Sequence, residues 1–142
     1  MRLVADTNIW VSGLLWGGKP EILFNLIEEG EVMVYVSPEI LAEIARVLGY
    51  RKFQKHLLRL ETTVTDLLEL VHSLTTLVET PKNQETLVVR DPTDDIFLHA
   101  AIHAKVNYLI SGDDHLLSLK EYRGIPIVTV HKFLQAHFPE HL

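Results

Sequence analysis

Cysteine is absent from this sequence of 142 residues. Disulfides, zinc–thiolate sites and cysteine nucleophiles are therefore excluded, and the absence is compatible with a reducing compartment. No apolar run approaches the roughly 20 residues that a membrane helix needs. The N-terminal stretch is too short and too soon acidic for a signal peptide. We therefore expect a cytoplasmic protein that has no contact with membranes.

Basic residues are also in the minority. The chain has 13 Lys and Arg against 19 Asp and Glu, a formal net charge of −6. Nucleic-acid binders usually show a basic footprint, so this balance argues mildly against one. A buried acidic cluster that holds metal would, however, lower the net charge without changing the outer surface. The basic residues are also bunched, and the bunch is either a solvated helix face or a surface for a substrate or partner: Arg46, Arg51, Lys52, Lys55, His56 and Arg59.

The remaining composition, with 47% hydrophobic and 23% charged residues, is that of a globular protein. The length predicts a single domain over residues 1–142 with a sizeable core. Strands are predicted at 2–5, 32–36, 108–110 and 125–130, with short extended pieces at 77–79 and 86–89. Helical patterns cover 20–29, 38–48, 51–60, 65–77, 94–105, 116–119 and 131–137, and 10–15 is helical or a loop. Strands that alternate with helices predict a parallel sheet covered on both faces.

Acidic residues stand where such a fold brings separate segments together. Asp6 directly follows the first strand, and Asp113 and Asp114 follow the strand at 108–110. In open parallel sheets, ligands bind at the carboxyl edge of the strands. Glu43 lies on the helix after the second strand, and overlooks the same edge if that helix begins there. Several carboxylates would repel one another at this place, so the arrangement makes sense mainly around a divalent cation.

Each of these acids also has a simpler structural explanation. Asp6 and Asp113 can form turns or helix caps where strands end, and Glu43 can be a solvated boundary residue. Thr7 and Asn8 add hydroxyl and amide groups, which suit a turn as well as a carboxylate or phosphate site. Taken singly, none of these residues decides between structure and function.

A further acidic group stands at the start of the helix predicted from residue 94. Acids at a helix N-terminus are favourable without any function. Asp91 or Thr93 fits the cap, and Asp94 has the same structural explanation. That leaves Asp95, on the first turn, less needed for capping.

Taken in order, these segments resemble the PIN-domain ribonucleases, the fold of many prokaryotic VapC-like toxins of toxin–antitoxin pairs. Segments 4–9, 37–44, 91–101 and 108–113 are similar to the four acidic motifs of that family, in matching strand and helix context. The resemblance covers nearly the whole chain. It implies a three-layer α/β/α sandwich with a central parallel sheet of about five strands.

The resemblance also implies an endonuclease that acts on single-stranded RNA with Mg²⁺ or Mn²⁺. By analogy, one or two ions are held by Asp6, Glu43, Asp95 and Asp113, some through water, and Ser111 sits beside these acids. Metal ions at an all-oxygen site activate water and stabilise charge on the phosphate and leaving oxygen. A toxin of this family implies a small antitoxin as partner, and family members commonly form homodimers.

One position departs from the family pattern. Family members often carry another Asp two residues after the fourth acid, where this chain has His115, and Asp114 lies between. His115 is a metal ligand, a phosphate contact or a plain surface residue, and the last is the simplest explanation. The departure leaves the number of metal ions open. His99 and His103, one helical turn apart, lack a matching third ligand for zinc and are interpreted as helix-face residues.

Two other classes of function stay open. Receiver domains and haloacid-dehalogenase-like phosphatases transfer phosphoryl groups to an aspartate at a strand end, but their patterns fit poorly here. The pair of Asp94 and Asp95 begins a late helix, and Asn8 holds the place of the second phosphatase Asp. A catalytically impaired module for nucleic-acid binding or assembly is the other alternative, because the loss of one peripheral acid can begin such decay.

Overall fold

A central sheet organises the fold. The computed structural model describes residues 1–81 and 92–142, except for the side chains of residues 92 and 93. In the described part, six strands form one sheet in the order β3-β2-β1-β4-β6-β5. The strands are β1 (Arg2–Ala5), β2 (Met33–Val36), β3 (Thr75–Leu77), β4 (Tyr108–Ile110), β5 (Glu121–Tyr122) and β6 (Ile125–Val128). Every pairing is parallel except that of β5 with β6, which is antiparallel.

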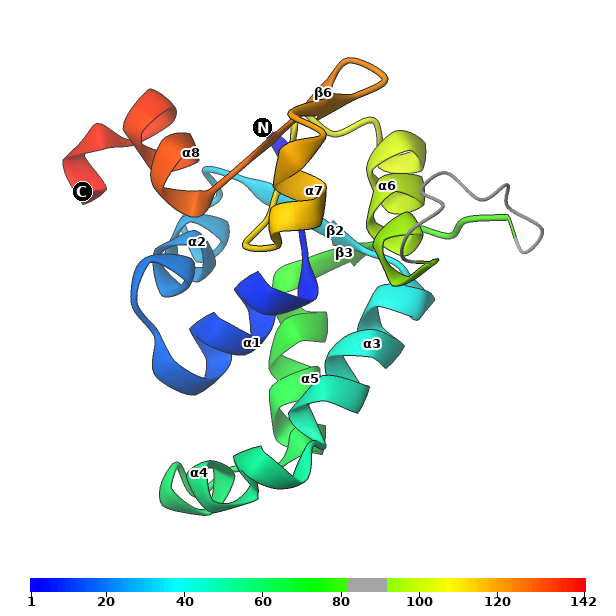
Figure 1. The fold of residues 1–142 in the computed structure, drawn as a ribbon. Helices are drawn as coiled ribbons and strands as arrows, with labels where there is room; N and C mark the ends of the chain where they lie inside the picture. Colours follow the sequence, from blue (N-terminus) through cyan, green and yellow to red (C-terminus); the bar gives the residue numbers. More distant parts are fainter. Residues whose placement is uncertain (82–91) are drawn as a thin grey trace.

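Helices flank this sheet (Figure 1). They are α1 (Thr7–Trp16), α2 (Lys19–Glu28), α3 (Pro38–Leu48), α4 (Gln54–Arg59), α5 (Val64–Leu74), α6 (Pro92–Ala104), α7 (Asp114–Ser118) and α8 (Val130–His137), with 3₁₀ turns η1 (Arg51–Phe53) and η2 (Pro139–His141). Helix α6 packs on β1, β2 and β4, whereas α1 packs against α2 and α3, and α3 against α5. The predicted α/β/α architecture is thereby confirmed.

The apolar sequence of the central strands explains their position in the core. Leu3, Val4, Leu109 and Ile110 are fully buried. Residues that are buried on both faces of a sheet produce a continuous apolar run rather than an alternating one. The register pairs Ala5 with Ile110. The residues that follow β1 and β4 therefore emerge side by side at the same edge of the sheet.

Helix α3 shows how the pattern of one helix positions a site. The Ser37 hydroxyl accepts a hydrogen bond from the Ile40 N–H at 3.2 Å and so caps the helix. Ile40, Ile44 and Leu48 recur at spacings of four and are fully buried. This stripe fixes the rotation of α3 about its axis and decides which polar side chains face outward.

The structure differs from the sequence predictions mainly at element boundaries. The helix predicted at 65–77 ends at Leu74, and β3, Thr75–Leu77, pairs with β2. A β-branched Thr-Thr sequence favours the extended conformation once a partner strand is available. The sheet edge at β5 was missed because its turn to β6 uses Arg123 at φ 48° and Gly124 at φ 82°, a sequence without the usual Asn-Gly signal. The predicted extended piece at 86–89 lies outside the described residues.

Smaller shifts have similar causes. Helix α1 begins at Thr7 rather than at residue 10, because Asp6 caps it. The helix predicted at 51–60 opens with a 3₁₀ turn, and the last predicted strand ends at Val128 because Thr129 caps α8. Within the described residues, no helix has the length and apolar character needed to cross a membrane.

Candidate functional site

Asp6 lies at the junction of β1 and α1. Its carboxylate caps α1 by accepting a hydrogen bond from the Ile9 N–H at 3.1 Å. The other carboxylate oxygen accepts hydrogen bonds from the Ser111 hydroxyl at 2.5 Å and from the Gly112 N–H at 3.1 Å. The capping explanation is therefore correct for Asp6. It leaves room for a second role, because the capping oxygen accepts one hydrogen bond within the described residues and a carboxylate oxygen has two lone pairs.

Burial is the main influence on the Asp6 carboxylate. It raises the pKa of Asp6 above its ordinary value, the hydrogen bonds from Ser111, Ile9 and Gly112 oppose that rise, and the neighbouring charge of Asp113 adds to it. The net direction is upward. A cation beside Asp6 would favour the ionised form and offset the cost of its burial.

Ser111 and Asp113 follow β4 at the same edge. The Ser111 hydroxyl is fully buried, donates to Asp6 and accepts a hydrogen bond from the Asp113 N–H at 2.9 Å. The Asp113 carboxylate accepts a hydrogen bond from the His115 N–H at 2.9 Å and so caps α7. Ser111 thus joins the acids of the first and fourth motifs through direct hydrogen bonds.

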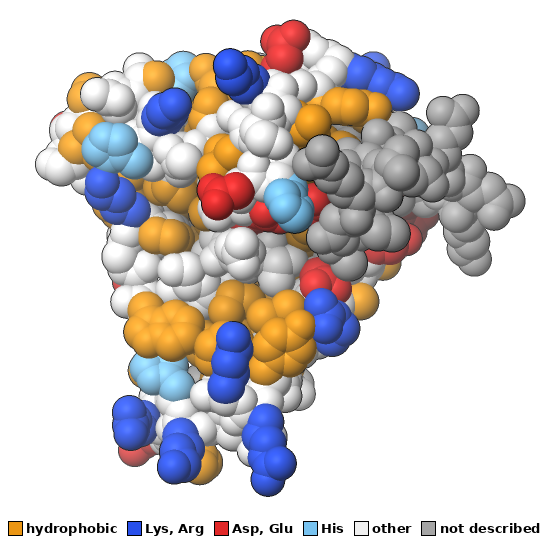
Figure 2. Space-filling view, in the orientation of Figure 1, with side chains coloured by type: hydrophobic (Ala, Val, Ile, Leu, Met, Phe, Trp, Pro, Cys, Tyr) orange, Lys and Arg blue, Asp and Glu red, His pale blue; other side chains and the backbone are white. Residues whose placement is uncertain are grey.

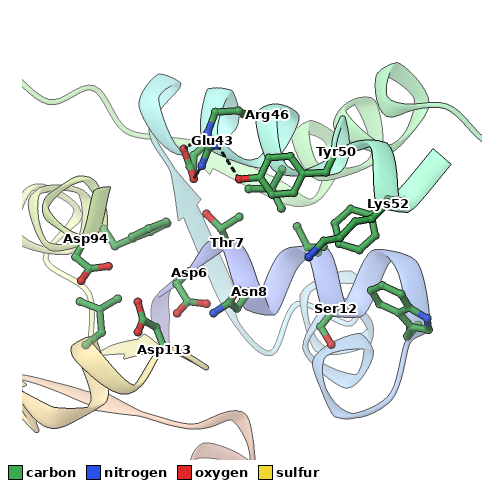
Figure 3. A pocket seen from close by; sticks show the side chains of 16 residues that line it. Asp6, Thr7, Asn8, Ser12, Glu43, Arg46, Tyr50, Lys52, Asp94 and Asp113 are labelled. Carbon is green, nitrogen blue, oxygen red and sulfur yellow. Dashed lines mark hydrogen bonds and ion pairs between the residues drawn. The ribbon is translucent and has the colours of Figure 1, made fainter. Parts of the chain in front are cut away.

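These acids open into a pocket of about 500 Å³. Figure 3 shows Asp6, Asp94 and Asp113 gathered at one end of the pocket, with Glu43 on α3 across from them. The polar and charged residues that line it are Asp6, Thr7, Asn8, Ser12, Glu43, Arg46, Lys52, Asp94 and Asp113. The site therefore combines four acidic side chains with two cationic ones.

Asp94 is buried, with 4% of its surface exposed, and it lines this pocket. Asp95, with 8% exposed, is not among the described lining residues. Consecutive residues on an α-helix point about 100° apart, so neighbouring side chains face different surroundings. Phe97, three residues after Asp94, lines the same pocket, as the helical period requires. Within α6, Asp94 is therefore the acid that faces the site.

One group of potential metal ligands stands out within the described residues. A carboxylate oxygen of Asp94, a carboxylate oxygen of Asp113 and a ring nitrogen of His115 all lie within 4.8 Å of one another. Two oxygen donors suit Mg²⁺ or Mn²⁺, whereas an imidazole nitrogen suits the transition metals better than Mg²⁺. The donor set fits a divalent cation, and it differs from the all-oxygen site that the sequence analysis expects.

Glu43 lies on the opposite wall and is held by an ion pair. Its two oxygens accept hydrogen bonds from Arg46 at 2.6 and 3.1 Å. Arg46 also donates to the Tyr50 hydroxyl at 2.7 Å. The hydrogen bond with Glu43 is the main cause that raises the pKa of Arg46. The guanidinium, whose side chain is 56% exposed, stays charged in any case, so Glu43 faces a permanent cation in this arrangement.

The family model of the PIN domain matches residues 2–115. The chain belongs to the PIN domain family. That membership supports a nuclease as its class of function. The uncharacterized protein MJ1680 of Methanocaldococcus jannaschii is 31% identical over 133 residues, which cover 92% of this chain and 83% of that protein.

Two solved structures are similar to this PIN domain. VapBC2 from Rickettsia felis, bound to a DNA fragment from their promoter, superposes with a TM-score of 0.61 at 14% identity, over 89% of this chain and 97% of that one. PAE2754 from Pyrobaculum aerophilum gives a TM-score of 0.58 at 16% identity, over 96% and 97% of the two chains. At these identities the similarity shows the fold.

The structure brings together most, but not all, of the residues that the sequence singled out for this PIN domain. Asp6, Glu43 and Asp113 line one pocket, whereas Asp95 is replaced in that lining by Asp94. The i, i+3 relation between Asp94 and Phe97 was the available signal, but capping offered a sufficient explanation for Asp94 from sequence alone.

The supporting residues separate in the same way. Thr7 and Asn8 line the pocket, and the Thr7 hydroxyl oxygen is buried with no hydrogen-bond partner in the described part of the chain. Ser111 donates a hydrogen bond to Asp6, and His115 belongs to the ligand cluster. Asp114 is exposed on the first turn of α7 and is not among the described lining residues.

Sequence reasoning gave no place in the site to one group of residues. Trp16, Tyr50 and Phe53 line this pocket together with Lys52. Figure 3 shows Tyr50 and Lys52 at the end away from Asp94 and Asp113. These lining residues come from the end of α1 and from the segment after α3, so nothing local in the sequence links them. Only the bunched basic residues pointed to this region.

Proposed function

We propose that this PIN domain is a metal-dependent endonuclease that hydrolyses phosphodiester bonds of single-stranded RNA in the cytoplasm. The observation that carries the proposal is the gathering of Asp6, Asp94 and Asp113 at one end of an open pocket. These carboxylates come from three elements that are distant in sequence. Such a concentration of like charge is costly without a cation. Burial is the main cause that raises the pKa of Asp6, and the charge of Asp113 adds to that rise.

One or two Mg²⁺ or Mn²⁺ ions fit the donors, and Asp6, Asp94 and Asp113 would hold them with help from His115. A bound ion supplies an activated water and stabilises negative charge on the phosphate and leaving oxygen. Ser111 fixes the orientation of Asp6 through its buried hydroxyl. The role of Asp95 as a ligand stays a prediction, and Asp94 is the alternative ligand from α6.

The wall opposite the acids has a different role, which is to bind phosphate. Arg46 and Lys52 place positive charge across the pocket from the acids. A substrate phosphate between the two walls would meet cations on one side and metal on the other. Glu43 would be a further ligand, or would orient Arg46 through their ion pair.

Cleavage of a fluorescent single-stranded RNA tests this function. We expect activity with Mg²⁺ or Mn²⁺, none after chelation, and a loss of at least about tenfold to 100-fold in D6N and D113N, since metal sites lose this much when their support is altered. D114N is the matched control, because Asp114 is an exposed acid that is not among the described lining residues. Cleavage that survives both chelation and D6N would come from a contaminating nuclease.

A second candidate function rests on His115, which stands in the ligand cluster in place of a carboxylate. A site weakened in this way would bind RNA without cutting it. Binding of the same RNA by wild-type protein, with no product at any Mg²⁺ or Mn²⁺ concentration, would favour this nucleic-acid-binding module over the nuclease.

We further propose that the chain is a VapC-like toxin, that it forms a homodimer, and that a small antitoxin blocks its pocket. The structural similarity to VapBC2 supports this proposal at the level of fold. Co-expression with the product of the adjacent reading frame tests the partner. The mass of the purified species, measured by light scattering, tests the dimer. A protein that is a monomer and does not bind that product would contradict both expectations.

A further inference from the structure

The pocket extends from the acids along α1 to an aromatic wall, which we define as Trp16, Tyr50 and Phe53. All three residues line the same pocket as Asp6. Trp16 is 60% exposed and Tyr50 is 36% exposed, which is unusual for side chains of this size. Exposed rings that gather at a pocket mark an interaction surface rather than a packing remnant.

The geometry of the wall is that of a preformed stacking site. The ring of Trp16 stacks on His56, with centroids 5.0 Å apart and planes 18° from parallel. The His56 ring is itself anchored by a hydrogen bond between Nε2 and the Leu15 carbonyl oxygen at 2.5 Å. Phe53 meets the Trp16 ring at its edge, with centroids 5.6 Å apart. Trp16 is thus held on one side and remains largely exposed.

Cations frame these rings. Lys52 Nζ lies 5.1 Å from the Phe53 centroid and 5.9 Å from the Tyr50 centroid. Arg46 Cζ lies 5.4 Å from the Tyr50 centroid. Residues 46–59 contain five Lys and Arg and no acid, although the whole chain has a net charge of −6. In Figure 2, Lys and Arg side chains lie across and below a hydrophobic band, and a group of acids lies directly above it.

We propose that the aromatic wall is a base-stacking subsite, in which an unpaired base of the RNA adds a third layer to the His56–Trp16 stack. Flat rings next to cations match a base next to its phosphates, and this combination binds single strands without reading their sequence. The five Lys and Arg within residues 46–59 favour a polyanion such as RNA as the occupant. The inference rests on the proposed function and names where its substrate lies.

The length of α1 sets the spacing. Asp6 caps its first turn and Trp16 is its last residue, so the helix spans about 15 Å at 1.5 Å per residue. At the roughly 3.4 Å spacing of stacked bases this is about four nucleotides, and fewer when the chain is extended. An oligonucleotide must therefore continue for a few nucleotides beyond the cleaved bond to reach Trp16.

Binding to a fluorescein-labelled ten-nucleotide single-stranded RNA, in the presence of chelator, tests the subsite without cleavage. We expect W16L to weaken binding by about 5-fold to 100-fold, the effect of losing one stacked base, and W16F to keep most of the affinity. Y122L is the matched control, because Tyr122 also carries a cation over its ring, Arg123 at 5.4 Å, but is not among the described lining residues. K52Q should weaken binding, and by a larger factor at low salt. K132Q on α8 should not have this effect.

An RNA of the same length that lacks its bases separates stacking from structural damage. Wild type should bind the RNA without bases as weakly as W16L binds the ordinary RNA. On the RNA without bases, W16L and wild type should have the same affinity. If W16L binds both RNAs like wild type, the inference is wrong while metal-dependent cleavage still supports the proposed function. If W16L loses only the affinity for a co-purified antitoxin, the wall is a protein contact and the inference is equally wrong. If wild type neither binds nor cuts RNA, the proposed function itself is wrong.

Discussion

Asp94 and Asp95 stand next to each other at the start of α6, yet their side chains have different surroundings. Asp94 lines the pocket and shares a ligand cluster with Asp113, whereas Asp95 does not belong to that cluster. The difference comes from the helical rotation of about 100° per residue. It turns the choice of third acid into a measurable question.

We predict that D94N weakens Mn²⁺ binding by about tenfold to 100-fold, the range for altered metal-site support. D95N should change the dissociation constant of Mn²⁺ by less than about threefold, since Asp94 and not Asp95 belongs to the ligand cluster. Titration of metal-free protein, followed by the electron paramagnetic resonance of free Mn²⁺, measures both constants. Equal losses in the two variants, with unchanged circular dichroism, would contradict the assignment to Asp94.

A second prediction concerns the buried carboxylate of Asp6. Its pKa in the folded protein is raised above the ordinary value of 3.8. Between the ordinary pKa and the raised pKa, the folded state therefore binds more protons than the unfolded state. The free energy of unfolding of metal-free protein should therefore fall as the pH rises through this window, and then stay at the lower level. Urea unfolding at a series of pH values, compared between wild type and D6N, isolates the contribution.

The same series with saturating Mn²⁺ provides the control. Metal should reverse the decline, because a bound cation favours the ionised carboxylate. Parallel profiles for wild type and D6N without metal would show that Asp6 does not carry the effect.

At the scale of elements, α3 and α1 place the two walls of the site. The buried stripe of α3 sets its rotation, and Glu43 and Arg46 then face the pocket. Helix α1 connects the two ends of the site, with Asp6 at its start and Trp16 at its end. Two packed helices thus position both walls of the site.

Because Ile44 is fully buried within this stripe, I44A should lower the free energy of unfolding by about 2–5 kcal/mol. Leu58→Ala on α4 is the control, since Leu58 is 77% exposed and surface changes usually stay within about 0.5 kcal/mol. Guanidinium unfolding measures both. A cost for I44A no larger than that for L58A would show that the stripe does not anchor α3.

The elements also show where sequence patterns succeed and fail. Helix α3 was predicted closely, because its cap at Ser37 and its stripe are local signals. For strand β3 the sequence pattern predicts the end of a helix, since the extended form of β3 depends on pairing with β2. Local propensity is a weak guide whenever a distant partner supplies the hydrogen bonds.

At the scale of the molecule, one group of acids and one group of cations occupy different places. Four acids line the pocket, and five Lys and Arg lie together within residues 46–59. A net charge of −6 hides this separation. The whole-chain balance therefore argued against nucleic acid more strongly than the local surface does.

Metal binding should also stabilise the whole fold. A cation that binds only the folded state at 100 times its dissociation constant adds about 2.7 kcal/mol to the free energy of unfolding. We expect Mg²⁺ or Mn²⁺ to raise the melting temperature of wild type and to leave a D6N/D113N double variant unchanged. Thermal unfolding by circular dichroism measures this. A melting temperature indifferent to millimolar metal would speak against an assembled site.

The sequence alone determined the four central strands, most helices, the four acidic motifs and the family, because apolar runs, caps and motif order are properties of neighbouring residues. The prediction of one domain over residues 1–142 stays a prediction. Tertiary structure decided which acid of α6 faces the pocket, how Arg46 holds Glu43, and that Trp16 shares a pocket with Asp6. These features depend on helix rotation and on contacts such as that between Ser111 and Asp6, 105 positions apart, which no local pattern encodes.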